Sequence, residues 1–496
     1  MFRFSYLLRQ SLLVLLFCGF VAGETSPSVQ PPAVTVQVLP GTPGRLLIEG
    51  AGPAGQAWSF RDSYAGIVGL GERVRGFQVF DGSGKQVEVR RIAPGQFESA
   101  QPATNFKYEI ELAPGSRPAD AAFTSWLGFE RGLLMFGDLF PQQLSAPGDR
   151  NAPITVRLVL PLQWNAYASN IGKPQTEFEI SDPDSAPVVV GKKIRVSTRA
   201  ILGKPFTMLT DGEWALADDE ALEVIANVLK LHGDTMAAFP CESASLVLLP
   251  FPQATGANKW SAQTRGCTTT LLMARSPSKL AARAQLGLAL THELFHFWVP
   301  NGLALSGDYD WFYEGFTMYQ AARAGVRLDL LSFEQYMNAI ADAYDGSLAA
   351  DPQNLSLIEA SKQRWTIGSS TVYSKAMVVA FLYDLNLRWQ TKGKRSLDDI
   401  YRSVVRTYVA KSAPGSAKPE GNSVVVAALR SELSDQQFVN RLVVERTKID
   451  LQKELAPFGL HVEKPGVRTH ISVDAQLSSR QRDLLKQLGY NEPRSR

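Results

Sequence analysis

The sequence predicts an α+β protein in which an antiparallel β-domain precedes a mainly helical half. Residues 44–204 contain short segments of alternating polar and apolar side chains, separated by Gly, Pro, Asn and Asp, a pattern typical of antiparallel strands. Apolar residues recur at helical spacing from Lys279 to Trp298, and helix-forming sequence continues to about residue 464. The chain of 496 residues is 45% hydrophobic and 20% charged, which is the balance of a globular protein.

The N-terminus predicts a secretory signal peptide over residues 1–23. A basic start precedes an uncharged apolar run from Leu12, and the run ends in small residues, so we expect cleavage after Ala22 or Gly23. An uncleaved anchor is the alternative, although the run is shorter than the ~20 residues that span a bilayer. We expect no stable membrane span after removal of the leader. The protein is therefore predicted to be exported, to the periplasm or the extracellular space.

The N-terminal β-domain is assigned to residues 24–205. Its first 20 or so residues are rich in Pro, Ser, Gly and Val and lead into a strand. Alternation broken by frequent turn residues favours an antiparallel sandwich or saddle. The clearest alternating segments are Arg45–Glu49, Phe106–Leu112, Ile154–Leu160 and Lys193–Ser197.

The pattern changes near residue 210, where a second domain is assigned to residues 206–464. Acidic residues suit the first turn of a predicted helix from Asp218 to about Leu231. A tail over residues 465–496 carries one short amphipathic piece. The other predicted elements are strands at Ser245–Pro250 and Cys267–Ala274, a helix that starts after Ser276-Pro277-Ser278 and runs to Trp298, and the amphipathic piece at Ser478–Leu488.

Charge and cysteine content limit the partners of the protein. The 51 basic and 48 acidic side chains leave a net charge of +3, which argues against a nucleic-acid partner because phosphate binding needs concentrated positive charge. Removal of the leader would remove Cys18 and leave Cys241 and Cys267. In an oxidising compartment these two could form a disulfide; two free buried thiols are the alternative. Two cysteines alone cannot form a zinc–thiolate site.

The clearest chemical motif is His292-Glu293-Leu294-Phe295-His296, at the end of a predicted helix. Two of the five histidines lie here. Residues four apart on a helix share one face, so both imidazoles can reach one ion. The H-E-x-x-H pattern predicts His292 and His296 as zinc ligands and Glu293 as a general base. A chance match is the alternative, and it would leave three buried polar groups in need of other partners.

A third zinc ligand is expected on the next helix. Glu314 follows His296 after 17 intervening residues, which is long enough for the chain to reverse. Asp310 can cap a helix that places Glu314 in its first or second turn. A solvent-facing Glu314 is the alternative, but an unpaired buried carboxylate is costly and the surrounding residues are aromatic: Trp311, Phe312, Tyr313 and Phe316.

The H-E-x-x-H motif followed by Glu314-Gly315-Phe316-Thr317 resembles the gluzincin metallopeptidases, the group that includes thermolysin and aminopeptidase N. Further segments resemble the glycyl-aminopeptidase family in particular. The resemblance extends from about residue 35 to residue 464 and is loose outside the site. These segments are His296–Trp298, Tyr373–Lys375, Asp384–Arg388, Ser396–Asp399 and, for the N-terminal β-domain, Trp58–Asp62.

The resemblance implies a thermolysin-like catalytic domain over residues 206–464, one Zn²⁺ per chain and a peptide or protein substrate. It also implies that Tyr373 stabilises the tetrahedral intermediate; an ordinary half-buried tyrosine is the alternative. In the implied mechanism Glu293 takes a proton from zinc-activated water, and zinc and Tyr373 stabilise the developing oxyanion. The sequence contains no Gly-x-Ser-x-Gly elbow and no evident Cys/His pair, which disfavours a covalent nucleophile.

Three features depart from the glycyl-aminopeptidase pattern. The connection between His296 and Glu314 is shorter than usual in that family and nearer to the aminopeptidase N spacing. The stretch Thr264–Thr269 lacks the carboxylate expected to hold a free substrate amine. It offers Arg265 instead, which is either a cation that repels the amine or a plain surface residue. Only 32 residues follow residue 464, too few for a C-terminal PDZ-type domain.

The sequence therefore predicts an exported zinc metallopeptidase, with aminopeptidase and endopeptidase action both open. The alternative is a catalytically weak or inactive protein of the same fold that binds or scaffolds; an intact Glu293 favours the enzyme. The other histidines, His232, His461 and His470, have no partner at metal-ligand spacing and are predicted to be structural or exposed. The physiological substrate and the oligomeric state do not follow from the sequence.

Overall fold

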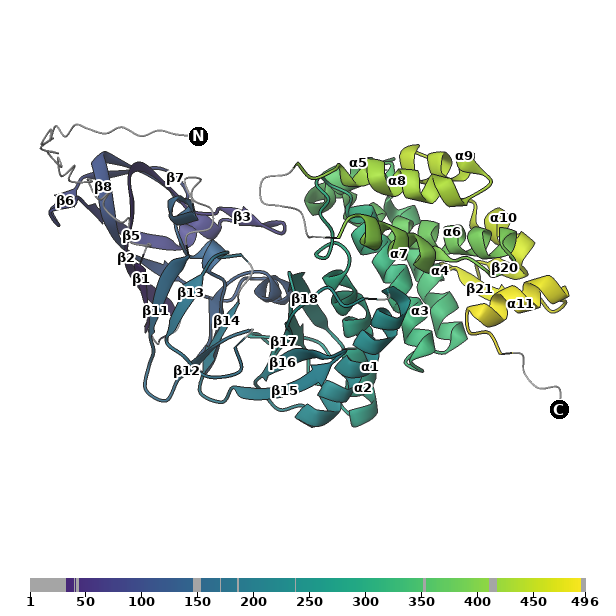
Figure 1. Cartoon of the computed structure of the whole chain (residues 1–496), viewed down its shortest axis with the longest axis horizontal. Helices are drawn as coiled ribbons and strands as arrows, with labels where there is room; N and C mark the ends of the chain where they lie inside the picture. Colours follow the sequence, from purple (N-terminus) through teal and green to yellow (C-terminus); the bar gives the residue numbers. More distant parts are fainter. Residues whose placement is uncertain are drawn as a thin grey trace, which may run out of the picture.

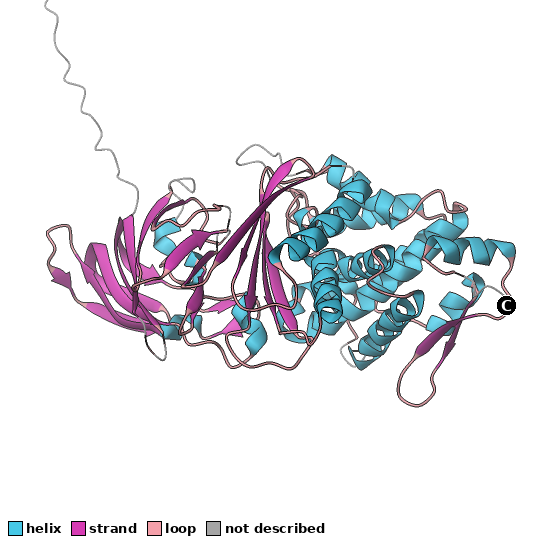
Figure 2. Cartoon of the chain, turned by 90° about the horizontal axis from the view of Figure 1, so that it is seen from below, coloured by secondary structure: helices cyan, strands magenta, loops and turns pink. Residues whose placement is uncertain are grey.

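The computed structural model describes residues 33–491, except residues 40, 42–43, 146–152, 170, 185–186, 237, 351–353 and 410–416. The predicted signal peptide, residues 1–23, lies outside the described residues. Strands fill one end of an elongated molecule and helices fill the other (Figures 1 and 2). This is the α+β arrangement that the sequence predicts.

The N-terminal domain is built on an eight-stranded sheet in the order β13-β11-β1-β2-β8-β5-β6, with β7 paired to β8. Its described strand pairs are antiparallel apart from β1 and β11, which are parallel. The long connection between those two strands permits the parallel pairing. The strands are β1 (Ala33–Leu39), β2 (Arg45–Ser59), β5 (Val74–Phe80), β6 (Gln86–Val87), β7 (Val89–Ala93), β8 (Gln96–Glu111), β11 (Ile154–Val159) and β13 (Glu177–Ile180).

A second sheet, of four strands in the order β12-β14-β10-β9, shares a hydrophobic core with the first. Alternation along β1 places Val34, Val36 and Val38 in this core, which also contains Val190 of β14. A separate two-stranded hairpin, β3–β4, leaves the domain near its start. The strands are β9 (Trp126–Leu127), β10 (Arg131–Leu134), β12 (Asn165–Ala168), β14 (Val188–Gly191), β3 (Ser63–Tyr64) and β4 (Ile67–Val68).

A third sheet, in the order β15-β16-β17-β19-β18, begins the second half of the molecule and leaves β18 at an edge. The inner strands β17 and β19 are buried along nearly their whole length, as expected for strands covered on both faces. One face packs on the N-terminal domain and the other packs on helices. The predicted division at residues 205–206 lies within β16. The strands are β15 (Arg195–Ile201), β16 (Lys204–Thr210), β17 (Ala244–Pro250), β18 (Trp260–Arg265) and β19 (Thr268–Met273).

The remainder of the chain is mainly helical, and α1 and α2 pack together against the third sheet. The last part of the chain returns as a two-stranded ladder, β20–β21, and a final helix. No helix among the described residues is long and apolar enough to cross a membrane. The helices are α1 (Asp218–Met236), α2 (Lys279–Glu293), α3 (Thr317–Arg327), α4 (Phe333–Ala350), α5 (Leu357–Lys362), α6 (Ala376–Gln390), α7 (Leu397–Thr407), α8 (Gly421–Glu432), α9 (Gln436–Val439), α10 (Leu451–Leu455) and α11 (Ser479–Gln487); β20 is Leu460–Glu463 and β21 is His470–Val473.

Candidate metal centre and catalytic cleft

Helix α2 carries the first part of the H-E-x-x-H motif. Its cap, Ser278, accepts a hydrogen bond from a backbone N–H of the first turn at 3.2 Å. The sequence predicted a helix that continues to Trp298, but α2 ends at Glu293 and Leu294–Phe297 form a 3-10 turn. Pro300 follows closely; because proline lacks an N–H and disfavours helical backbone before it, the helix cannot run far past this point.

His292 and His296 face each other although a change of helix type separates them. Their Nε2 atoms lie 3.1 Å apart and both side chains are buried. The carbonyl of Val299 lies 2.8 Å from His296 Nδ1 and can only accept, so Nδ1 carries the proton and Nε2 keeps its lone pair. Burial lowers the pKa of His296, which favours the neutral ring. The buried Nδ1 of His292 has no hydrogen-bond partner among the described residues.

Glu314 completes a set of three donors from the π-helical segment Trp311–Phe316. Its Oε2 lies 3.3 Å from Nε2 of His292 and 3.7 Å from Nε2 of His296. The three donor atoms all lie within 4.8 Å of one another. Zinc binds such atoms at ~2.0–2.2 Å in tetrahedral geometry, which separates its ligand atoms by about 3.4 Å. The donor set therefore fits a zinc ion.

Arg364 joins Glu314 to two neighbouring groups. Its Nη2 lies 2.8 Å from Glu314 Oε1 and also donates to the hydroxyl of Tyr373, while its Nη1 lies 2.8 Å from Asp310 Oδ1. Burial alone would raise the pKa of Glu314, but Arg364 and the two imidazoles lower it to about 2. The predicted cap by the Asp310 side chain is wrong. The Asp310 backbone is already helical, and its carboxylate pairs with Arg364 instead.

Glu293 is buried beside the three donors and points toward the edge strand β18. The hydroxyl of Thr264 donates to Glu293 Oε2 at 2.8 Å, and it lies 2.9 Å from the hydroxyl of Thr269. Burial raises the pKa of Glu293 to about 7, although the interaction with the neighbouring His296 imidazole acts in the opposite direction. A carboxyl group with a pKa in this range can both accept and release a proton near neutral pH.

Tyr373 lies on the π-helical segment Thr371–Lys375, directly before α6. Because its oxygen accepts a hydrogen bond from Arg364, the phenolic proton is available for donation to another group. Burial raises the pKa of Tyr373 above its ordinary value, which keeps the phenol protonated. This placement ahead of a helix agrees with the expectation from the sequence.

One cleft of about 990 Å³ is lined by all five predicted site residues. Strand β18 and the segments that carry Arg364 and Tyr373 all line this cleft. The hairpin β3–β4 of the N-terminal domain also lines this cleft. The structure therefore brings together His292, Glu293, His296, Glu314 and Tyr373.

Arg265 has neither of the roles considered from the sequence. It does not line the cleft, and it is half-buried rather than exposed. Its guanidinium donates to the backbone carbonyls of Asp184, at 2.7 Å, and Phe123, at 3.3 Å, and lies 4.6 Å from the ring centre of Tyr64. These partners all belong to the N-terminal domain, so Arg265 holds the end of β18 against that domain.

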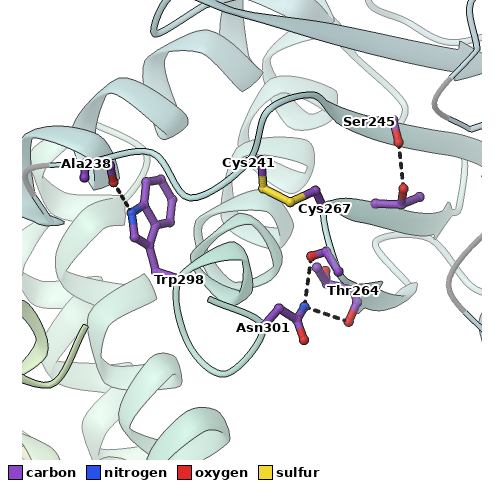
Figure 3. Close-up of a disulfide and its surroundings, with 9 residues drawn as sticks. Ala238, Cys241, Ser245, Thr264, Cys267, Trp298 and Asn301 are labelled. Carbon is purple, nitrogen blue, oxygen red and sulfur yellow. Dashed lines mark hydrogen bonds between the residues drawn. A yellow bond between two sulfur atoms is a disulfide. The ribbon is translucent and has the colours of Figure 1, made fainter. Parts of the chain in front are cut away.

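A disulfide between Cys241 and Cys267 joins the segment before β17 to the turn before β19 (Figure 3). The Asn301 side-chain amide donates to the carbonyls of Thr264 and Gly266 beside it. The structure thus contains the disulfide that the sequence left open, and it lies next to the end of the strand that carries Thr264.

The three remaining histidines lie outside the cleft lining. His232 is buried, with Nε2 3.0 Å from the carbonyl of Thr291, and burial lowers its pKa to about 4. His461 is exposed and His470 is half-buried. The sequence did not predict the contacts of Arg364 and Thr264 with the site residues, because no local pattern marks either residue.

The N-terminal domain is similar to a known family. Residues 63–185 match the family model described as Peptidase M61 N-terminal domain. A comparison with curated protein sequences finds no match.

Solved structures share the fold at low sequence identity. An aminopeptidase N family protein from Idiomarina loihiensis aligns with a TM-score of 0.73 and 16% identity, over 87% of this chain and 79% of that chain. An M1 zinc metallopeptidase from Deinococcus radiodurans aligns with a TM-score of 0.51 and 16% identity, over 85% of this chain and 94% of that chain. A mutant of the latter, bound to a Tyr-Ser-Ala substrate, aligns with a TM-score of 0.50 and 16% identity over the same shares of the two chains.

The fold is that of M1 aminopeptidase-like structures. Together with the family match, it supports a metallopeptidase of the gluzincin type. The narrower glycyl-aminopeptidase assignment stays a prediction.

Proposed function

We propose that this chain is an exported zinc-dependent metallopeptidase that hydrolyses peptide bonds with zinc-activated water. The observation that carries the proposal is the convergence of three donor atoms, from His292, His296 and Glu314, within 4.8 Å of one another and beside the buried carboxyl group of Glu293. A zinc site with three protein ligands leaves a fourth position open, as catalytic zinc sites do.

Zinc bound at this site would supply a Lewis acid and lower the pKa of water to about 7. Glu293, held by Thr264, takes the proton of the attacking water and passes it to the leaving amine. The Tyr373 hydroxyl donates to the substrate carbonyl oxygen as negative charge develops there. Arg364 fixes the oxygen of Tyr373 and the outer oxygen of Glu314.

Export is part of the proposal and has separate support. The basic and apolar start of the sequence is that of a signal peptide, and the Cys241–Cys267 disulfide is of a kind that persists in oxidising compartments. We further propose an N-terminal β-domain that ends before the third sheet and a catalytic domain that begins with this sheet at β15; β21 and α11 of the predicted tail belong to the second unit, because β21 pairs with β20 and α11 contributes to its core.

Metal analysis combined with a matched pair of variants tests the function. Purified protein should contain close to one zinc per chain, and a content below about 0.2 per chain would contradict the site. Glu293→Gln should retain zinc and lose at least ~100-fold in kcat/KM on peptides. Glu463→Gln, an exposed change on β20, serves as the control.

The alternative, a catalytically weak or inactive protein of the same fold that binds or scaffolds, predicts a different result. In that case zinc is present, peptides are hydrolysed poorly by wild type, and Glu293→Gln changes nothing. Chelation followed by re-addition of zinc separates the two cases, because only an enzyme regains turnover.

A further inference from the structure

The β3–β4 hairpin leaves the N-terminal domain and projects toward the helical half (Figure 1). Tyr64 pairs with Ile67 across its turn, and Ala65 and Gly66 both have positive φ, as in the tight turns that favour hairpins. Asp62 holds the base of the hairpin, because its carbonyl accepts a hydrogen bond of 2.9 Å from the backbone N–H of Leu70, just after β4. The hairpin is therefore a defined element rather than an open loop.

One side of the hairpin is fixed to the β18 wall of the cleft. Gln263 of β18 donates its side-chain amide to the hydroxyl of Tyr64. The centre of the Tyr64 ring lies 5.1 Å from the guanidinium of Arg61 and 4.6 Å from that of Arg265. Arg61 forms two hydrogen bonds with the carboxylate of Asp184, at 2.7 and 2.8 Å. This set of contacts immobilises Tyr64 beside the strand.

The tip of the hairpin approaches Trp365, the neighbour of Arg364 in the sequence. A Cβ placed on Gly66 would lie 3.4 Å from the Trp365 ring and 3.6 Å from its carbonyl oxygen, so the turn approaches this residue closely. Trp365 in turn lies on the guanidinium of Arg364, at 4.2 Å. The hairpin thus extends from Gln263 on β18 to Trp365.

The hairpin lies close to Glu293, the proposed general base. Gln263 is adjacent on β18 to Thr264, which contacts Glu293. Strand residues repeat every ~3.3 Å, so an extended peptide beside the open edge of β18 would meet the hairpin after about one or two residues. Half-exposed Trp365 and exposed Val68 give this end of the cleft an apolar surface.

We propose that the β3–β4 hairpin closes one end of the cleft, so that the enzyme acts on short peptides and on free ends of longer chains, from which it removes one or two residues. This inference rests on the proposed peptidase function. It decides the choice between terminal and internal cleavage that the sequence left open.

The test compares a free tetrapeptide with a peptide of about ten residues that contains the same four residues. The longer peptide is ~33 Å long when extended and is acetylated and amidated. Two variants open the end of the cleft: Trp365→Ala, and replacement of Ser63–Val68 by two glycines. Phe129→Ala is the matched control, since Phe129 is exposed and does not line the cleft. The readout is the ratio of kcat/KM for the blocked peptide to kcat/KM for the free peptide, because this ratio cancels changes in the catalytic groups.

Wild type should release one or two residues at a time from a free end, and its kcat/KM for the blocked peptide should be at least about tenfold lower than for the free peptide. Both opening variants should raise the ratio of blocked to free kcat/KM about tenfold, and Phe129→Ala should leave this ratio unchanged. Singly blocked peptides identify which end enters. Internal cleavage of the blocked peptide by wild type at the rate of the free peptide, or an unchanged ratio in a correctly folded Trp365→Ala protein, would overturn the inference. If the zinc-loaded wild type hydrolyses none of the peptides, the proposed function itself fails, which is a distinct result.

Discussion

Replacement of Arg364 by alanine should destabilise both the fold and the proposed zinc site. The guanidinium is the partner of two buried carboxylates, Asp310 and Glu314, each at 2.8 Å, and it also donates to Tyr373. Asp310 is 6% exposed and Glu314 is 7% exposed, so neither carboxylate can be fully solvated in place. Loss of Arg364 leaves both without their counter-charge.

The size of the effect follows from the cost of a broken buried ion pair, which is ~3–5 kcal/mol. The cleft gives both carboxylates some access to water, so we expect the lower end, about 3 kcal/mol, for the metal-free protein. Arg364 also fixes the oxygen of Glu314 that faces away from the histidines. Loss of such outer contacts of a ligand typically costs about 10–100-fold in metal affinity.

Urea unfolding of the metal-free chain measures the first quantity, and zinc competition with a chelator measures the second. Arg364→Lys keeps the charge but lacks the planar fork that reaches Asp310, Glu314 and Tyr373 together, so it should recover part of the stability and little of the turnover. Exposed Arg468→Ala is the control. An Arg364→Ala protein with wild-type stability and wild-type zinc affinity would refute the reasoning.

Three further outcomes follow from buried groups away from the cleft. Asp384 is completely buried and accepts three hydrogen bonds, so Asp384→Asn should lower the free energy of unfolding by about 3–5 kcal/mol in urea. Burial alone would raise the pKa values of Asp384 and Asp398, but neighbouring arginines hold both below the usual range. The two ionised carboxylates therefore stabilise the fold above about pH 4, and this contribution is lost as the pH falls through their pKa values in the folded protein; the free energy of unfolding at pH 6 and at pH 3 measures the loss. If Asp384→Asn lost as much stability between these two pH values as wild type, the assignment would be contradicted. The Cys241–Cys267 disulfide closes a separation of 26 residues, so replacing both cysteines by serine should cost about 3 kcal/mol, and equal stability of the two proteins in oxidising buffer would argue against it.

The site could be predicted from the sequence wherever its geometry is local. His292 and His296 are four residues apart, so helical spacing alone brings their rings together, even though α2 gives way to a tighter turn between them. Glu314 follows after a connection that only has to reverse direction. The spacing of these residues therefore determines most of the proposed metal site.

The remaining contacts depend on packing that no local pattern encodes. Arg364 meets its partners Asp310 and Glu314 about 50 residues away along the chain. Thr264 reaches Glu293 only because β19 lies between β17 and β18 and leaves β18 at the edge beside α2. The contacts of Arg265 could not be predicted from the sequence for the same reason, since its partners lie in another domain. Charge and alternation in the sequence do not specify such pairings.

The buried charges of the cleft also explain why a divalent cation suits it. Among the described residues that line it, the buried acidic groups are Glu293, Asp310 and Glu314, and Arg364 is the cation that pairs with two of them. With all three carboxylates ionised, this set carries two excess negative charges, which is costly in a poorly solvated site. In the chain alone, burial, reinforced by the charge of Glu314, raises the pKa of Glu293 to about 7, so protonation relieves part of the excess. A divalent cation held by His292, His296 and Glu314 would balance the same charges and would let Glu293 stay ionised, which is the state in which it can accept a proton from water.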